Sequence, residues 1–135
     1  MKPGPSLNKA RRGHGCTRIG NDSIIVAGGW HTRQNGIRRR SKSTEILKIG
    51  DLAWTNGPDL KEGIYLNEIV KSNGADYIAY SLGGYTGWGW DHVSDKIYGL
   101  RRDRNEWQLV DSMSEHRYRG SALNIPSSLI PWCEL

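Results

Sequence analysis

The chain has 135 residues, enough for one domain, with 36% hydrophobic residues, no phenylalanine and a formal net charge of +5 at pH 7. No apolar run approaches the roughly 18 residues of a membrane-spanning helix, so we expect no such span. The 17 glycines and 6 tryptophans favour an all-β protein with many turns and a few large buried rings.

The first half of the chain is predicted to form a four-stranded unit. The apolar, β-branched run at residues 23–27 ends at Gly28-Gly29 and is typical of a strand buried on both faces. Gly20-Asn21-Asp22 tolerates the positive φ of a hairpin, so the preceding residues are expected to pair with this strand. Residues 1–10, punctuated by proline and glycine, are expected to be loose. The four strands are expected at residues 11–19, 23–27, 43–49 and 52–55, with a polar loop at 30–42.

The same pattern then returns. A second apolar run ends at Gly83-Gly84, 55 residues after the first glycine pair, and Trp107 follows Trp54 by 53 residues. Leu60 and Met113 share the spacing of 53 residues, so three markers repeat together. The second set of strands is expected at residues 64–71, 77–82, 95–100 and 107–110, with a loop at 85–93, and a shortened third unit begins at residue 117.

Four strands in about 50 residues, with a double glycine and a tryptophan, are typical of a propeller blade. The chain resembles kelch repeats in the order of its markers, and the second unit departs from the pattern at its start, where Ile64-Tyr65-Leu66 replaces the basic residue. The markers of unit one are Arg12, Gly28-Gly29, Thr44-Glu45 and Trp54, and those of unit two are Gly83-Gly84, Ile97-Tyr98 and Trp107.

The resemblance implies an all-β, partial kelch-type β-propeller of four-stranded antiparallel blades. Because closed propellers have about 4–8 blades, we expect an open arc rather than a closed ring, with the remaining blades supplied by a longer chain or by other copies. The expected division is a loose segment at 1–10, blade 1 at 11–62, blade 2 at 63–113 and a partial third blade at 114–135. Structural roles are expected for Gly28, Gly29, Trp54, Gly83, Gly84 and Trp107, with each tryptophan packed between neighbouring blades.

Kelch domains resemble one another in capturing partner peptides with the loops that follow the double glycines. Here one such loop is strongly basic and the other is aromatic, a combination that favours an acidic peptide as partner. We therefore predict a non-catalytic protein-interaction module. The predicted partner-binding residues are Arg33, Arg38, Arg39, Arg40, Tyr85, Trp88 and Trp90. A glycan-binding (lectin-like) propeller fragment and an inactive fragment of a longer kelch protein are the alternatives, while nucleic acid is disfavoured because the charge excess is modest.

Nothing in the sequence points to an enzyme. The four histidines lie far apart, and Cys16 and Cys133 lack metal-ligand spacing, so neither a metal, a cofactor nor a catalytic residue is expected. Both cysteines are predicted to be buried free thiols. Residues 1–5 have no apolar core, so we expect no signal peptide there. A cytoplasmic location follows unless the true N-terminus is missing, in which case secretion stays open.

Overall fold

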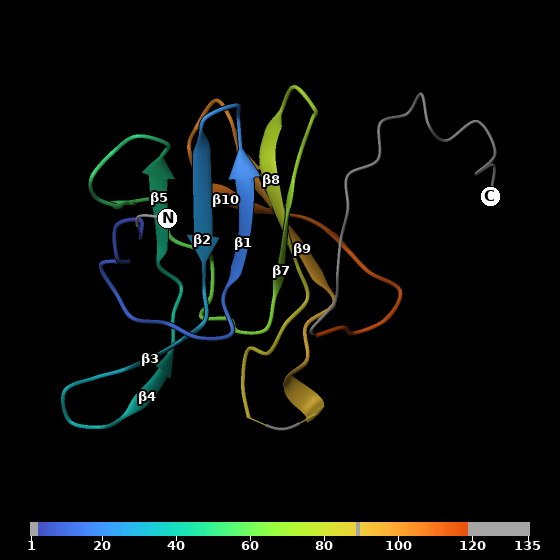
Figure 1. The fold of residues 1–135 in the computed structure, drawn as a ribbon. Helices are drawn as coiled ribbons and strands as arrows, with labels where there is room; N and C mark the ends of the chain where they lie inside the picture. The colour runs from blue at the N-terminus through green and yellow to red at the C-terminus, as the bar shows by residue number, and fades with distance from the viewer. Residues whose placement is uncertain (1–2, 89, 119–135) are drawn as a thin grey trace.

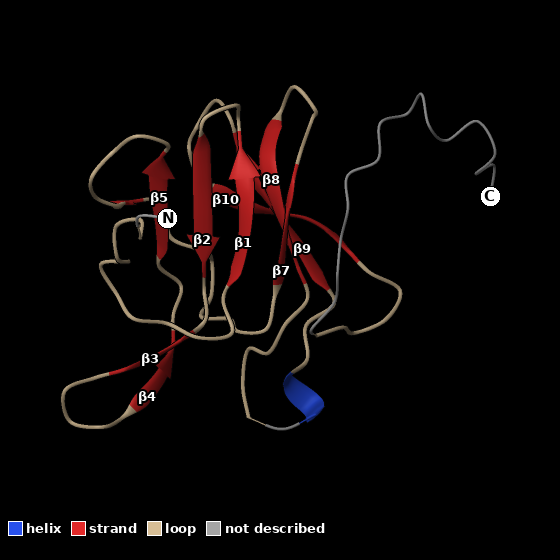
Figure 2. Cartoon of the chain, viewed as in Figure 1, coloured by secondary structure: helices blue, strands red, loops and turns tan. Residues whose placement is uncertain are grey.

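Two four-stranded antiparallel sheets make up the fold in the computed structural model, which describes residues 3–88 and 90–118 (Figures 1 and 2). The first sheet has the order β1-β2-β5-β6, with β1 at Gly15–Ile19, β2 at Ser23–Ala27, β5 at Thr44–Lys48 and β6 at Thr55–Asn56. The second has the order β7-β8-β9-β10, with β7 at Glu68–Lys71, β8 at Tyr77–Leu82, β9 at Lys96–Arg101 and β10 at Trp107–Ser112. Over the described residues the sheets do not close into a barrel.

The predicted all-β class and the antiparallel four-stranded sheets are confirmed. The polar loop predicted at residues 30–42 instead contains a two-stranded ribbon, β3 (Trp30–Thr32) with β4 (Arg38–Arg40). The second loop contains one 3-10 turn, η1 (Trp90–His92). The third unit predicted from residue 117 lies almost wholly outside the described residues.

Three strands start at least three residues later than predicted. Gly15 rather than Arg11 begins β1, Thr55 rather than Leu52 begins β6, and Glu68 rather than Ile64 begins β7. The backbone of Ile64 leaves the second sheet to bond to the first unit, where its carbonyl accepts from Gly29 N at 2.7 Å. Residues 64–67 therefore connect the sheets instead of extending β7.

The sequence repeat is also a repeat of backbone hydrogen bonds. Gly84 N donates to Arg117 O at 2.7 Å, which is the same bond, one unit later, as that from Gly29 to Ile64. The amide of Ser94 likewise donates to Gly84 O at 2.7 Å, as the amide of residue 41 donates to Gly29 O at 2.8 Å. The second glycine of each pair is thus hydrogen-bonded to the chain segment that follows its own unit.

The glycine pairs occupy backbone positions that a side chain would disturb. Gly28 and Gly29 have φ values of +73° and +89°, in the region that favours glycine. A Cβ on Gly28 would lie 2.5 Å from the carbonyl oxygen of Ile64. Both the conformation and the close approach of the neighbouring chain therefore require glycine here.

Substituting Gly28 with alanine is expected to destabilise the protein by more than the roughly 1–2 kcal/mol that a left-handed conformation costs a non-glycine residue. Gly20→Ala is the matched control, because Gly20 has a φ of +57° and no atom within 4 Å of an added Cβ. The difference between the two variants in urea unfolding gives the cost of displacing the Ile64 carbonyl. Equal losses would contradict a steric role for Gly28.

A single core lies between the two sheets, where β1 of the first sheet runs beside β7 of the second (Figure 1). The approach is close, because a Cβ on Gly15 would lie 2.5 Å from the side chain of Ile69. Trp107 is the largest fully buried side chain, and its Nε1 donates to the carbonyl of Pro58 at 3.1 Å. The core residues are Ile19, Ile25, Ala27, Leu60, Ile64, Ile69, Ala79, Tyr98, Leu100 and Trp107.

The N-terminal segment, expected to be loose, is hydrogen-bonded to the first sheet over residues 5–9. The carboxylate of Glu45 is buried and needs donors, and it accepts from Asn8 N at 2.7 Å and Lys9 N at 3.2 Å. Trp54 Nε1 donates to the carbonyl of Pro5 at 2.9 Å. This bond matches the one from Trp107 to Pro58, so residues 5–9 lie against the first sheet much as residues 58–62 lie against the second.

Candidate functional site

The ribbon β3–β4 projects from one end of the first sheet (Figure 1). Its turn forms because Gly36, at a φ of +78°, donates its amide to Arg33 O at 2.9 Å, while Arg33 N donates to Ile37 O at 2.9 Å. Asn35 caps the turn by accepting from Ile37 N at 3.2 Å. The ribbon is held to the sheet because Trp30 N donates to Arg12 O at 2.8 Å.

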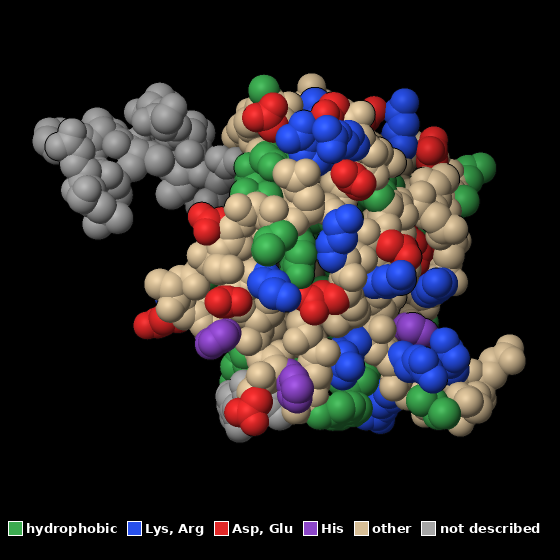
Figure 3. Space-filling view, turned by 180° about the vertical axis from the view of Figure 1, so that it is seen from behind, with side chains coloured by type: hydrophobic (Ala, Val, Ile, Leu, Met, Phe, Trp, Pro, Cys, Tyr) green, Lys and Arg blue, Asp and Glu red, His purple; other side chains and the backbone are tan. Residues whose placement is uncertain are grey.

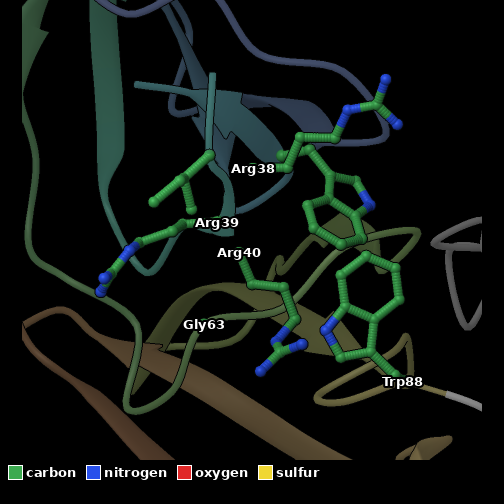
Figure 4. Close-up of a pocket in the computed structure, with 7 residues that line it drawn as sticks. Arg38, Arg39, Arg40, Gly63 and Trp88 are labelled. Carbon is green, nitrogen blue, oxygen red and sulfur yellow. The ribbon is translucent and has the colours of Figure 1, made fainter. Parts of the chain in front are cut away.

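Pairing within the ribbon separates the three consecutive arginines onto two faces. Directly opposed residues share a face, and successive residues alternate. Because Trp30 opposes Arg40, the side chains of Arg38 and Arg40 lie on the face that carries Trp30, whereas Arg39 shares the other face with His31. Figure 4 shows this division: Arg40 points toward Trp88, and Arg39 points away from it.

The first of these faces, together with Arg39, lines an open pocket of about 380 Å³ (Figure 4). Trp88 forms the opposite wall and is 68% exposed. Its ring centroid lies 4.9 Å from that of Trp30, with the planes inclined by 55°. We call this hollow the arginine–tryptophan pocket; its lining residues are Trp30, Ile37, Arg38, Arg39, Arg40, Gly63 and Trp88.

An aromatic row continues from this pocket toward the second unit. Tyr65 lies with its ring centroid 4.5 Å from that of Trp30 and 5.2 Å from that of Tyr85, on which it stacks. The centroids of Tyr85 and Tyr118 are 4.6 Å apart. Tyr85 is therefore joined to the pocket-lining Trp30 through one intervening ring, that of Tyr65, and does not itself line the pocket.

The arginines of the ribbon have no acidic partners among the described residues. Arg33, Arg38, Arg39 and Arg40 form no ion pair there, whereas Lys42 pairs with Asp59 at 3.7 Å. Residues 30–42 contain no acidic side chain. Figure 3 shows the resulting cluster of Lys and Arg side chains at the lower right, over the ribbon. The positive charge at this end of the molecule is therefore available to an anionic ligand.

Two histidines near this end have pKa values that their surroundings lower. Burial, together with the charges of Lys9, Arg33, Arg11 and Arg39, lowers the pKa of His31 below 6.5. Burial and the charge of Arg11 lower the pKa of His14 in the same way. The basic character of the ribbon thus comes from arginine and lysine, not from histidine.

The structure brings together part of the predicted site. Arg38, Arg39, Arg40 and Trp88 line one pocket, Arg33 lies in the ribbon turn, and Tyr85 belongs to the aromatic row. Trp90 begins η1, and its side chain lies outside the described part of the chain.

Sequence reasoning missed three contributors, namely Arg12, Trp30 and Tyr65. A signal was available for two of them, because Arg12, Tyr65 and Tyr118 recur at intervals of 53 residues. Trp30 and Tyr85 similarly follow their glycine pairs at once. Backbone bridges join Arg12 to Trp30 and Tyr65 to Tyr85, so the first two members of the first set are each paired with a member of the second.

The described residues offer little evidence for a metal site, a buried cysteine or a membrane span. No group of three or more His, Cys, Asp or Glu side chains there is arranged to hold a metal ion. Cys16 is exposed, so its predicted burial is wrong: it lies on the solvent side of β1, while Cys133 falls outside the described residues. None of the described helices has the length and apolar character to cross a membrane. No protein-family model matches the chain, and a search of curated proteins finds no match.

Proposed function

We propose that the two sheets are blades of a kelch-type β-propeller, arranged as part of an open arc. The support is the recurrence of the bonds that join Gly29 to Ile64 and Gly84 to Arg117, in which the glycines are 55 residues apart and their acceptors 53 residues apart. In each sheet the strands also follow chain order from the strand nearest the neighbouring sheet outward. The third unit and any further blades come from the rest of this chain, a longer chain or other copies.

We further propose that the module binds a partner protein without catalysis, by taking an acidic peptide into the arginine–tryptophan pocket. The observation that carries this proposal is the pair Arg38 and Arg40, unpaired by any described acid, beside an indole that is 68% exposed. Guanidinium groups bind carboxylates through paired hydrogen bonds, and tryptophan and arginine are the side chains that dominate interface energies. A Glu or Asp followed by an apolar residue fits both features.

The proposal predicts that a fluorescein-labelled, Glu-rich peptide binds the protein and that Arg38→Ala/Arg40→Ala weakens binding by at least about tenfold. A hydrogen bond to a charged group is worth roughly 1.5–3 kcal/mol, and about 1.4 kcal/mol corresponds to a factor of ten. Fluorescence anisotropy measures both proteins. Binding is also expected to weaken as salt increases, because the contacts are exposed.

The control for this experiment is Arg102→Ala/Arg104→Ala. These arginines lie in the β9–β10 turn, at the opposite end of the molecule from the ribbon (Figure 1), and their loss changes the net charge by the same amount. The control is expected to bind the peptide as the unaltered protein does. Equal weakening in both variants would mean that net charge, and not the pocket, attracts the peptide.

A glycan is the second candidate ligand, favoured by the exposed ring of Trp88 packed beside Trp30. Sugar rings stack on such indoles without needing charge. A neutral glycan that changes tryptophan fluorescence, with a response lost in Trp88→Ala and kept in Arg38→Ala/Arg40→Ala, would replace the acidic peptide as the ligand of this pocket.

A further inference from the structure

The other side of the ribbon borders a second hollow. An open groove of about 840 Å³ runs between the N-terminal segment and the ribbon turn. The segment is fixed in place because Asn8 and Lys9 donate their amides to the buried carboxylate of Glu45. We call this hollow the N-terminal groove; it is lined by Asn8, Lys9, Ala10, His31, Thr32, Arg33, Gln34 and Asn35.

The N-terminal groove is lined by basic and neutral polar groups, and none of its lining residues is acidic. Lys9 enters from the N-terminal segment and Arg33 from the ribbon turn, and both are exposed. Neither side chain has an ion-pair partner among the described residues. Arg39 lines the arginine–tryptophan pocket and not this groove, but it directly opposes His31 in the ribbon and so adds a third cation beside the groove.

The pKa of His31 is sensitive to the positive charge of these cations. Its Nδ1 is buried and has no hydrogen-bond partner among the described residues, so burial disfavours a charge on the ring. The charged groups that face it are Lys9 and Arg11 from the N-terminal segment and Arg33 and Arg39 from the ribbon, and with burial they lower its pKa. None of the charged groups that shift the pKa of His31 is a carboxylate.

We propose that the N-terminal groove binds a phosphate monoester, held by Lys9, Arg33 and Arg39. A phosphate monoester carries a charge of about −1.5 to −2 at pH 7 and three strong acceptor oxygens, so it offers an acceptor for each of the three cations. A single carboxylate supplies only half of that charge. Thr32, Gln34 and Asn35 provide neutral polar groups along the same wall.

This site shares Arg39 with the arginine–tryptophan pocket but has no other lining residue in common with it, and it does not rest on the proposed function. Arg39 and His31 share one face of the ribbon, and Arg38 and Arg40 lie on the other. The Arg38→Ala/Arg40→Ala variant therefore tests the pocket and is expected to leave anion binding in the groove intact. Either proposal can therefore fail in its own experiment while the other is upheld.

The first test uses sulfate as a dianion whose charge does not change between pH 5 and 8. The imidazole of His31 is titrated by NMR in sodium sulfate and in sodium chloride at equal ionic strength. Bound sulfate favours the imidazolium, so the His31 pKa is expected to rise in sulfate and stay low in chloride. By reciprocity, sulfate binds more tightly as the pH falls below 6.5 and His31 takes up its proton.

Lys9→Ala/Arg33→Ala is the test variant. Removing the two cations is expected to raise the pKa of His31 even without sulfate and to abolish the further rise on adding it. Arg102→Ala/Arg104→Ala, with the same loss of charge at the far end, should behave as the unaltered protein. The imidazole resonances of His92 and His116, which are exposed, serve as references. A His31 pKa that responds identically to sulfate and chloride, or an unchanged response in Lys9→Ala/Arg33→Ala, overturns the proposal.

The source of the phosphate is distinguished by three ligands added separately in sodium chloride without sulfate. Inorganic phosphate, a phosphoserine peptide and the same peptide without phosphate are each titrated, and the rise of the His31 pKa is followed. A rise with inorganic phosphate and with the phosphoserine peptide, but not with the unmodified peptide, confirms a phosphate site. A rise at lower concentration with inorganic phosphate assigns a free anion, and a rise at lower concentration with the phosphopeptide assigns a modified protein. An equal rise with the unmodified peptide would contradict phosphate recognition.

Discussion

Replacing Glu45 with alanine is expected to destabilise the protein by about 3–5 kcal/mol, the usual cost of breaking a buried ion pair from one side. Arg11 Nη2 lies 2.7 Å from Glu45 Oε1, and each of the two side chains is only 1% exposed. The substitution leaves a guanidinium buried with no counter-charge and removes the acceptor of the Asn8 and Lys9 amides. Because a small domain is stable by only about 5–15 kcal/mol, urea unfolding followed by circular dichroism detects this loss readily.

Two further variants separate the causes of this loss. Glu45→Gln keeps an oxygen acceptor and removes the charge, so its cost isolates the ion pair from the backbone hydrogen bonds. Lys48→Ala breaks a surface pair, with 3.7 Å between Lys48 Nζ and Asp22 Oδ2 and side chains 63% and 58% exposed, and is expected to cost roughly 0–1 kcal/mol. A cost for Glu45→Ala within that small range would show that water or a rearranged Arg11 compensates for the missing carboxylate.

The Arg11–Glu45 pair also explains why the N-terminal segment is ordered. Arg11 is already bound to the first unit, with Nη1 donating to Gly28 O at 2.9 Å and to Ser43 O at 2.8 Å. The carboxylate of Glu45 neutralises the charge of Arg11. Its oxygens accept two further hydrogen bonds, which the backbone amides of residues 8 and 9 donate. The second unit has Ile64 and Tyr98 at the corresponding positions, and there Tyr98 donates to Glu62 Oε1 at 2.7 Å instead. The ion pair is thus a feature of the first unit alone among those described.

The strands were predictable because their apolar runs end at glycines with a fixed spacing. A buried strand and a tight turn each have a signature in the local sequence. The strands predicted at residues 23–27 and 77–82 therefore match β2 and β8. The start of β7 was not predictable, since residues 64–67 are apolar enough to extend the strand. Their backbone is instead hydrogen-bonded to Gly13 and Gly29, and these long-range bonds are not visible in the local sequence pattern.

The candidate site was predictable in composition and not in geometry. Consecutive arginines and a tryptophan-rich loop are visible in the sequence, and the resemblance to kelch repeats predicts that both loops contribute to one binding surface. The division of the arginines onto two faces depends on the ribbon, whose strands are only three residues long and strongly polar. The groove at Lys9 depends on the Arg11–Glu45 pair, because that pair holds the N-terminal segment beside the ribbon.

Replacing Trp107 with alanine is expected to cost about 3–5 kcal/mol, because its ring is fully buried between the sheets. The indole Nε1 also donates to Pro58 O, in the segment that leads from the first sheet to the second. Its loss removes packing and leaves that carbonyl without this donor. Trp107→Phe keeps most of the ring and removes the donor, so it is expected to lose only a part of this stability, about 0.5–1.5 kcal/mol for the hydrogen bond.

Trp54→Ala is the matched comparison, since Trp54 holds the same place in the first unit and donates to Pro5 O at 2.9 Å. Its ring is half-buried and packs at the N-terminal segment, so less apolar surface is lost when it is removed. We therefore expect a smaller cost for Trp54→Ala, with unfolding still a single transition. Trp107→Ala, in contrast, weakens the contact that couples the two sheets, so its urea transition is expected to broaden or divide. If both variants lose the same stability with equally sharp transitions, the two tryptophans contribute equally, and the contact between the sheets does not depend on Trp107.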